Sequence, residues 1–129
     1  MSELERVRDF FSKDRFATEN GAVIEEVGDH YAKCSMTLTD RHKNAVGGIM
    51  GGVYFTLADF TFAVATNWKE PGTVSITGDI SFIGVPKGGK LIAESELIKN
   101  GSTLSCYNIR ITDELGTPVA AVKMVGFKK

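Results

Sequence analysis

The chain has 129 residues, of which 43% are hydrophobic, and this content is enough for a core without disulfides or a structural metal. Its 15 basic and 16 acidic residues are spread along the sequence and give a formal net charge of −1. This balance leaves no basic surface of the kind that binds nucleic acid or an anionic membrane, so neither is an expected partner. We expect a single globular domain over residues 1–129, located in the cytoplasm.

A short amino-terminal helix is predicted within residues 1–14. Ser2 and Glu5 have the spacing of a capping box, which marks a helix start. Apolar residues then recur at helical intervals, at Leu4, Val7, Phe10 and Phe11. We expect this helix to have a structural role.

A β-hairpin with one buried face is predicted in residues 22–38. Apolar and β-branched residues precede a turn signal at Gly28-Asp29, and apolar residues alternate with polar ones after it. Cys34 lies in this hairpin, and Cys106 lies in a similar apolar segment. Neither has a CxxC partner or a histidine at metal-ligand spacing, so both are expected to be buried core thiols in a reducing compartment.

The two histidines do not form a metal site, because no cysteine or carboxylate stands at ligand spacing from them. His30 lies at the turn beside Asp29, and His42 precedes a glycine-rich loop, from which it could approach a site. Both are expected at the surface. The sequence contains no nucleophile elbow, P-loop or dinucleotide-binding fingerprint.

The run from Ile49 to Thr66 is almost entirely apolar or small, yet it carries one carboxylate, Asp59. It is too long for a typical strand, and a membrane span would need roughly 20 apolar residues without a central carboxylate. Its apolar residues surround the helical axis, so a core helix covered on all sides is predicted. An unpaired buried carboxylate is costly, so Asp59 must lose its charge or find partners, and such groups are often functional.

Strands are predicted in the remaining sequence, at residues 73–83, 90–99, 104–112 and 118–127. Short turns separate them, and Asn100-Gly101 is the strongest hairpin signal in the chain. No second helix is long enough to connect parallel strands. The pattern predicts an α+β fold, with an antiparallel sheet packed on one buried helix.

The stretch from Asn44 to Ala63 resembles the N-x-x-G-x-x-H-G-G-x(6)-D signature of hotdog-fold acyl-CoA thioesterases of the phenylacetate-pathway (PaaI) type. The matching residues are Asn44, Gly47, Gly51, Gly52 and Asp59. The segment 75–82 and the opening hairpin also resemble parts of that family, so the likeness covers about residues 15 to 128.

The resemblance implies a hotdog fold, in which a five- or six-stranded antiparallel sheet wraps a long central helix. It implies hydrolysis of an acyl or aryl thioester of coenzyme A to a carboxylic acid and free coenzyme A, with no tightly bound cofactor. In the family pattern, the backbone N–H of Gly51, aided by Asn44, polarises the thioester carbonyl at a helix start, where negative charge is favoured. Asp59 would be general base or nucleophile, and Ser75 would orient the attacking water.

The resemblance also implies an obligate homodimer with shared active sites, with a homotetramer as a further assembly. Asn44 and Gly51 of one subunit would face Asp59 and Ser75 of the other. Further contacts with the substrate are expected from Met50, Gly52, His42 and Thr77.

Each site residue also has a structural alternative. Asn44 could satisfy the backbone of its loop, the glycines could serve close packing, and Asp59 could be hydrogen-bonded to the opposite subunit. Thr73 and Thr77 are alternatives to Ser75, because the strand register can slip by one or two residues.

Met50 departs from the family pattern, which has histidine at this position. Methionine neither titrates nor donates a strong hydrogen bond, but it can fill an apolar pocket. One alternative to a thioesterase is a non-catalytic acyl-CoA-binding hotdog module, which Met50 favours and the presence of Asp59 disfavours. A second alternative is a hotdog hydratase or dehydratase, but those enzymes pair the aspartate with a nearby histidine, and no such pair surrounds Asp59. The acyl group, aryl or medium-chain, stays open.

Overall fold

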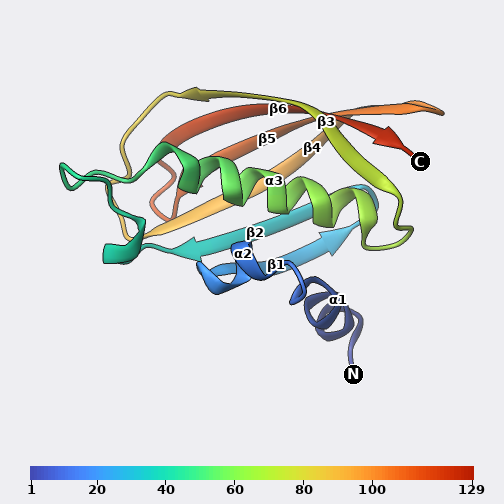
Figure 1. Cartoon of the computed structure of the whole chain (residues 1–129), viewed down its shortest axis with the longest axis horizontal. Coiled ribbons are helices and arrows are strands. Elements are labelled where there is room, and N and C mark those ends of the chain that lie inside the picture. The colour runs from blue at the N-terminus through green and yellow to red at the C-terminus, as the bar shows by residue number, and fades with distance from the viewer.

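The computed structural model describes all residues, 1–129, and contains three α-helices, one short 3-10 helix and six strands. In chain order the elements are α1 (Glu3–Phe11), α2 (Arg15–Glu19), β1 (Ala22–Gly28), β2 (Tyr31–Thr37), η1 (Asp40–His42), α3 (Gly51–Asn67), β3 (Thr73–Phe82), β4 (Lys90–Asn100), β5 (Leu104–Asp113) and β6 (Pro118–Lys128). The strands form one antiparallel sheet in the order β1-β2-β4-β5-β6-β3, which curves around α3 (Figure 1). The predicted α+β architecture is confirmed.

The amino-terminal helix begins where its capping signal predicts. The Ser2 hydroxyl accepts a hydrogen bond from the Glu5 backbone N–H at 3.1 Å, and the side chains of Val7 and Phe11 are buried against the core. A second helix, α2, follows directly and was not predicted, because five residues are too few for a periodic pattern. Both helices lie against β1.

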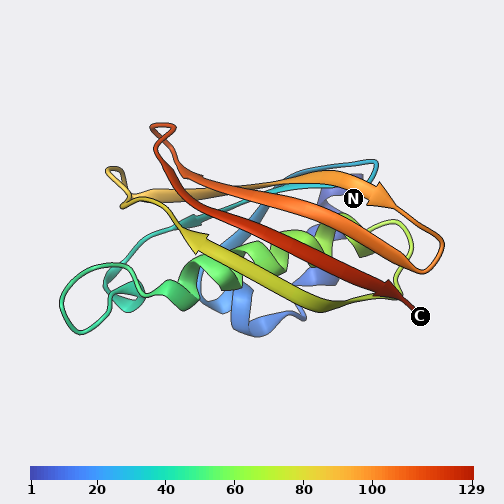
Figure 2. The ribbon, with the colours of Figure 1, turned by 90° about the horizontal axis from the view of Figure 1, so that it is seen from above.

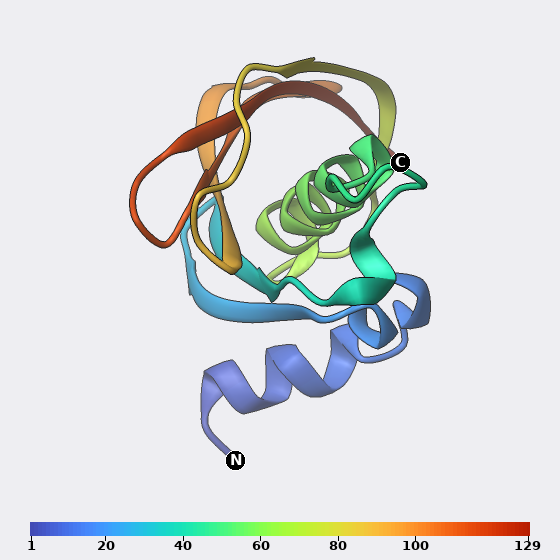
Figure 3. The same ribbon diagram turned by 90° about the vertical axis from the view of Figure 1, so that its left-hand side faces the viewer.

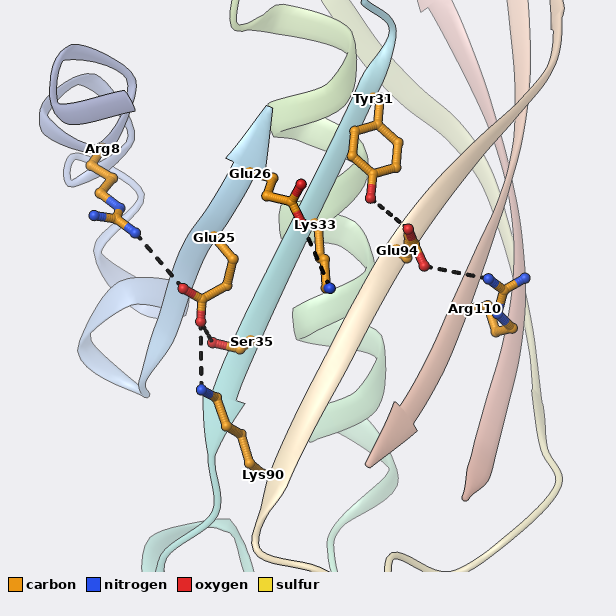
Figure 4. Close-up of polar contacts among 9 residues, drawn as sticks. All are labelled: Arg8, Glu25, Glu26, Tyr31, Lys33, Ser35, Lys90, Glu94 and Arg110. Carbon is orange, nitrogen blue, oxygen red and sulfur yellow. Dashed lines mark hydrogen bonds and ion pairs between the residues drawn. The ribbon is translucent and has the colours of Figure 1, made fainter. Parts of the chain in front are cut away.

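Polar contacts fix the outer side of the hairpin. Arg8 and Lys90 form ion pairs with the Glu25 carboxylate, at 3.8 and 3.5 Å, and the buried Ser35 hydroxyl donates to the same carboxylate at 2.7 Å (Figure 4). The Ser35 bond, despite the opposing effect of burial, holds the pKa of Glu25 below its ordinary value. Helix α1 is thereby held at a defined place on the sheet.

The central helix α3 is covered on one side only. Its core-facing residues include the fully buried Leu57 and Val64, and Figure 3 shows the sheet curled around this helix. A stripe at helical spacing, comprising Phe55, Asp59 and Ala63, is only half-buried. The prediction of a helix covered on all sides is wrong for a single chain, because β3 and residues 13–17 flank this stripe at Phe55 and Asp59 without closing over it. No helix of the structure is long and apolar enough to span a membrane.

Strand β3 forms a free edge of the sheet, since it pairs with β6 on one side and with nothing on the other (Figure 2). Most of its residues are exposed, including the apolar Val74 and Ile76, the second of which is 57% exposed. An uncovered strand edge with apolar side chains is a typical surface for pairing with another chain.

A β-bulge at Ile76 changes the direction of the side chains along β3. The register pairs Ser75 with Gly126 but Thr77 with Val125, so one residue of β3 has no partner. Partners in antiparallel strands share a face. Ser75 therefore points to the helix side of the sheet and Thr77 to the outer side, although an unbroken strand would have placed both on one face.

The cysteines differ in burial. Cys34 is fully buried, as predicted, and burial raises the pKa of its thiol to about 12. Cys106 is only half-buried, because it lies opposite Val125 on the outer face of the sheet, so the prediction of a core thiol is wrong there. The two thiols are both free.

Candidate active site

The start of α3 presents unpaired backbone donors. Gly51 is the first residue of this helix, and the N–H groups of Gly51 and Gly52 have no acceptor in the chain, whereas the Val53 N–H bonds the Met50 carbonyl at 3.0 Å. The partial positive charge of a helix start favours a developing negative charge at these donors. A Cβ atom on Gly51 would lie only 3.0 Å from the Phe82 ring. Glycine, which has no Cβ, therefore fits best at this position.

Met50 lies beside these donors. It is the N-cap residue of α3, has an extended backbone and is 51% exposed. Its terminal methyl group lies 3.1 Å from the position that a Cβ of Gly52 would occupy. Met50 thus offers an apolar surface next to the free N–H groups and no polar group of its own.

Asn44 holds the loop that leads to the helix. Its side-chain oxygen accepts hydrogen bonds from the backbone N–H groups of Val46 and Gly48, both at 3.0 Å. The structural alternative considered for Asn44 is therefore realised, but its Nδ2 group has no acceptor in the chain. Asn44 can shape the loop and still donate one hydrogen bond to a bound group.

Asp59 lies two turns further along α3 and is half-buried. The Ser75 hydroxyl donates to the Asp59 carboxylate over a long distance of 3.5 Å. Burial raises the pKa of Asp59 above its ordinary value, the Ser75 bond opposes this shift, and the negative charge of Asp14 adds to it. A half-buried carboxylate with a raised pKa and one weak partner has the properties of a general base.

A hollow of about 440 Å³ opens beside Asp59. Its walls are the exposed side of α3 and residues 13–17, which end the α1–α2 connection and begin α2. The lining residues are Lys13, Asp14, Arg15, Phe16, Ala17, Phe55, Thr56, Asp59 and Phe60. No sequence pattern marks Asp14 or Phe16 as site residues, because only the fold-back of the amino-terminal segment brings them near Asp59. A second hollow, of about 390 Å³ at the other end of α3, is mainly polar and contains none of the predicted site residues.

His42 does not lie at the surface, so that prediction is wrong. It is 3% exposed; its Nδ1 accepts from the Thr39 backbone N–H at 2.9 Å, and its Nε2 lies 2.6 Å from the Asn20 carbonyl oxygen, to which it donates. Both ring nitrogens are thus engaged within the chain. His30 is half-exposed at the tight β1–β2 turn, with a positive φ of 52°.

The predicted residues form two half-sites rather than one site. The donor half comprises Asn44, Met50, Gly51 and Gly52 at the start of α3, and the acid half comprises Asp59 and Ser75. Two helical turns, about 12 Å along the axis, separate Gly51 from Asp59. One thioester carbonyl cannot contact both groups of the same chain. Thr77 belongs to neither half, since the bulge at Ile76 turns it to the outer face.

Comparison with solved structures identifies the fold. No family model matches the chain. The solved structure of the Escherichia coli PaaI protein from the phenylacetic acid degradation operon superposes with a TM-score of 0.89 over 99% of this chain and 96% of that chain, at 24% identity. A hypothetical thioesterase of Streptococcus pneumoniae, solved with coenzyme A, gives a TM-score of 0.83 at 20% identity over 92% of this chain and 96% of that chain. The fold is therefore the hotdog fold.

Sequence relatives identify the family within this fold. A protein of Archaeoglobus fulgidus named "Putative esterase" is 30% identical over 122 residues, which cover 93% of this chain and 79% of that protein. Acyl-coenzyme A thioesterase 13 of Homo sapiens is 29% identical over 84 residues, which cover 63% of this chain and 60% of that protein. The chain belongs to a family of esterases and thioesterases with the hotdog fold.

Proposed function

We propose that this protein hydrolyses acyl-CoA thioesters to a carboxylic acid and free coenzyme A. The observation that carries the proposal is the half-buried Asp59 carboxylate, with its raised pKa, in a fold whose helix start presents the unpaired N–H of Gly51. Coenzyme A in the related Streptococcus pneumoniae structure supports coenzyme A as the thiol carrier.

In the proposed reaction, the acid half-site activates water and the donor half-site stabilises the thioester oxygen. With Asp59 as general base, the carboxylate takes a proton from a water molecule held beside Ser75 as the water oxygen attacks the thioester carbon. The carbonyl oxygen becomes negative and is stabilised by the Gly51 N–H, with the free Nδ2 of Asn44 as a second donor. The carbon–sulfur bond then breaks, and the thiolate takes up the proton. If Asp59 acts instead as nucleophile, the same donors serve and water hydrolyses the resulting anhydride.

A homodimer completes the site in this proposal. Within one chain the two half-sites are about 12 Å apart along the helix, whereas the half-buried stripe of α3 and the free β3 edge lie open to a second chain. Antiparallel pairing of two β3 edges would continue the sheet and set Asp59 of one subunit toward Gly51 of the other. A two-fold axis generates two identical sites. Pairing of two dimers into a tetramer belongs to the same proposal.

Complementation tests the shared site. We expect Asp59→Asn and Gly51→Pro to be inactive alone and to recover activity when the two chains are refolded together. Half of the dimers in an equal mixture are heterodimers, and each has one intact site of two, so about a quarter of wild-type activity is expected. Activity is measured as thiol release from acyl-CoA, and dimer formation by sedimentation. A mixture that forms heterodimers and stays inactive would place all catalytic groups in one chain.

The pH dependence of hydrolysis is a further prediction. Because the reaction needs the ionised carboxylate, kcat/KM should fall as the pH drops through the raised pKa of Asp59. Asp14→Asn removes a negative charge, which lowers this pKa and moves the acid limb to lower pH. Ser75→Ala removes a hydrogen-bond donor and moves the limb to higher pH. Profiles of kcat/KM against pH for the three proteins check both directions; an unmoved limb in both variants would contradict Asp59 as the titrating group.

A non-catalytic acyl-CoA-binding module is the second candidate, and the apolar Met50 at the start of α3 favours it. Thiol release from a panel of aryl, short, medium and long acyl-CoA esters separates the two functions. Hydrolysis of any ester that is lost in Asp59→Asn supports the enzyme. Binding of acyl-CoA without hydrolysis of any ester would make the protein a binding module.

A further inference from the structure

We infer that the outer edge of β1 is a second strand-pairing surface, complementary to the same strand of another copy of this chain, and that helix α1 keeps it closed. The sheet has two edge strands, β3 and β1. Pairing of β3 in the proposed dimer would leave the two β1 strands as the outer edges of the joined sheet. That consequence for the dimer rests on the proposed function, whereas the closure of β1 by α1 does not.

Side chains from outside the sheet bond backbone carbonyls of β1. The Nε of Arg8, on α1, donates to the Ile24 carbonyl at 2.7 Å, and the Nε1 of Trp68, which follows α3, donates to the Gly28 carbonyl at 2.7 Å. On β3, only the first residue, Thr73, has a side-chain partner for its backbone groups. Carbonyls that an added strand would need are therefore already bonded on β1 and open along most of β3.

A β-bulge with a held charge also interrupts β1. The register of β1 with β2 leaves Glu25 without a partner residue. Its carboxylate is bound by the Arg8 guanidinium, the Lys90 ammonium and the Ser35 hydroxyl (Figure 4). Bulges, charged side chains and covering helices are the means by which natural sheets prevent an edge strand from pairing. Strand β1 combines all three, whereas β3 has a bulge but no covering helix.

Apolar contacts seat α1 on the chain in addition to Arg8. Val7 and Phe11 are 7% and 6% exposed, and the Phe11 ring packs edge-to-face on Phe60 of α3, with centroids 6.2 Å apart. The helix lies against β1, as Figure 3 shows. Strand β1 is seven residues long, and its apolar Val23 is 44% exposed even with α1 in place. Loss of the cover would thus uncover a strand edge of ordinary length with apolar side chains.

A second copy of β1 is the partner that fits this edge. Identical strand edges can pair antiparallel about a two-fold axis, and such a contact is self-complementary. With the β3 edges joined in the proposed dimer, each dimer has one β1 edge at either end of its sheet. Pairing at both ends has no point of closure, so opened dimers would join into chains of indefinite length.

The test opens the β1 edge in the full-length protein. Arg8→Leu removes both contacts of the guanidinium, and Arg8→Leu/Phe11→Ala also loosens the seat of α1. The matched control, Arg6→Leu/Phe10→Ala, makes the same changes at exposed residues of the same helix. A further variant adds Val23→Lys to Arg8→Leu/Phe11→Ala, because a lysine on an edge strand opposes its pairing. Sedimentation velocity measures the mass of the assemblies, and circular dichroism measures folding.

We expect Arg8→Leu/Phe11→Ala to form assemblies of more than about twice the wild-type mass. Adding Val23→Lys should restore the wild-type mass, and the control should keep it. If Arg8→Leu/Phe11→Ala is not folded, Arg8→Leu, which keeps the apolar seat of α1, gives the same comparison. An unchanged mass in the folded variants would show that β1 does not pair. Assemblies that persist with Val23→Lys would form through another surface, and either result overturns the inference.

Thiol release from acyl-CoA by the same samples separates this inference from the proposed function. Hydrolysis by wild type, without larger assemblies of the opened variants, would leave the function and remove the closed β1 edge. Larger assemblies that Val23→Lys reverses, without hydrolysis by wild type, would leave the closed edge and remove the function.

Discussion

Replacing Asp59 by asparagine is expected to lower kcat for acyl-CoA hydrolysis by about a hundredfold to ten-thousandfold, the range for losing a general acid–base group. Asparagine keeps the shape of the side chain but cannot accept the proton of water at neutral pH. Because a general base acts on the attacking water rather than on the bound ester, KM should change little if Asp59 has this role. Steady-state thiol release gives both constants.

The control for this substitution is Asp9→Asn, which makes the same chemical change at an exposed aspartate of α1. It should leave kcat within about twofold of wild type, as expected for a surface substitution away from the site. Circular dichroism and melting curves should show both variants folded. Equal rates in wild type and Asp59→Asn would remove Asp59 from the mechanism.

Removal of the Gly51 backbone N–H is expected to cause the second large loss of activity. We expect Gly51→Pro to lower kcat by about a hundredfold to a thousandfold, the loss measured when one oxyanion donor is deleted. Proline is well suited to this position, because the first helical residue has no intrahelical N–H bond to lose. The preceding Met50 already has the extended conformation that a following proline requires, with φ of −63° and ψ of 136°.

Gly51→Ala is the matched control, since it adds the same Cβ atom near the Phe82 ring and keeps the N–H. Phe82 is exposed and its ring can move aside in both variants. We expect alanine to retain most of the activity that proline loses, as measured by kcat on the preferred ester. Equal activity of the two variants would show that the Gly51 N–H does not bind the developing oxyanion.

Much of the fold follows from local sequence patterns. The four predicted strands after the helix agree with β3 to β6 to within a residue or two, because Pro, Gly and Asn-Gly signals mark their turns. The central helix also agrees closely, since its length and apolar character leave no alternative. Its open stripe could not be predicted, because the apolar composition of a helix does not reveal which of its sides the same chain covers.

Part of the geometry of the candidate site follows from residues that are close in sequence. Gly51 and Gly52 lie at the helix start because the glycines and the apolar run meet there. Ser75 rather than Thr77 lies beside Asp59, because of a bulge at Ile76 that no sequence pattern in β3 indicates. The register of a strand depends on its partner, here β6, and not on its own sequence alone.

The burial of His42 could not be predicted from the sequence for a different reason. Its partners are the backbone of Asn20 and the nearby Thr39, and the first of these comes from a helix too short to predict. Every residue has a backbone carbonyl, so the sequence does not show which carbonyl a histidine side chain will bond. Thr39 three residues before His42 was the available signal, since this spacing suits a cap in which the histidine takes part.

The free edge of β3 also has a consequence for the handling of the protein. An isolated subunit would carry unpaired strand N–H and carbonyl groups beside exposed Val74 and Ile76, and this combination recruits further strands indiscriminately. In the proposed dimer, pairing of the two β3 edges would protect solubility as well as complete the site. Substitutions that weaken the pairing are expected to appear first as precipitation during expression, before any loss of specific activity can be measured.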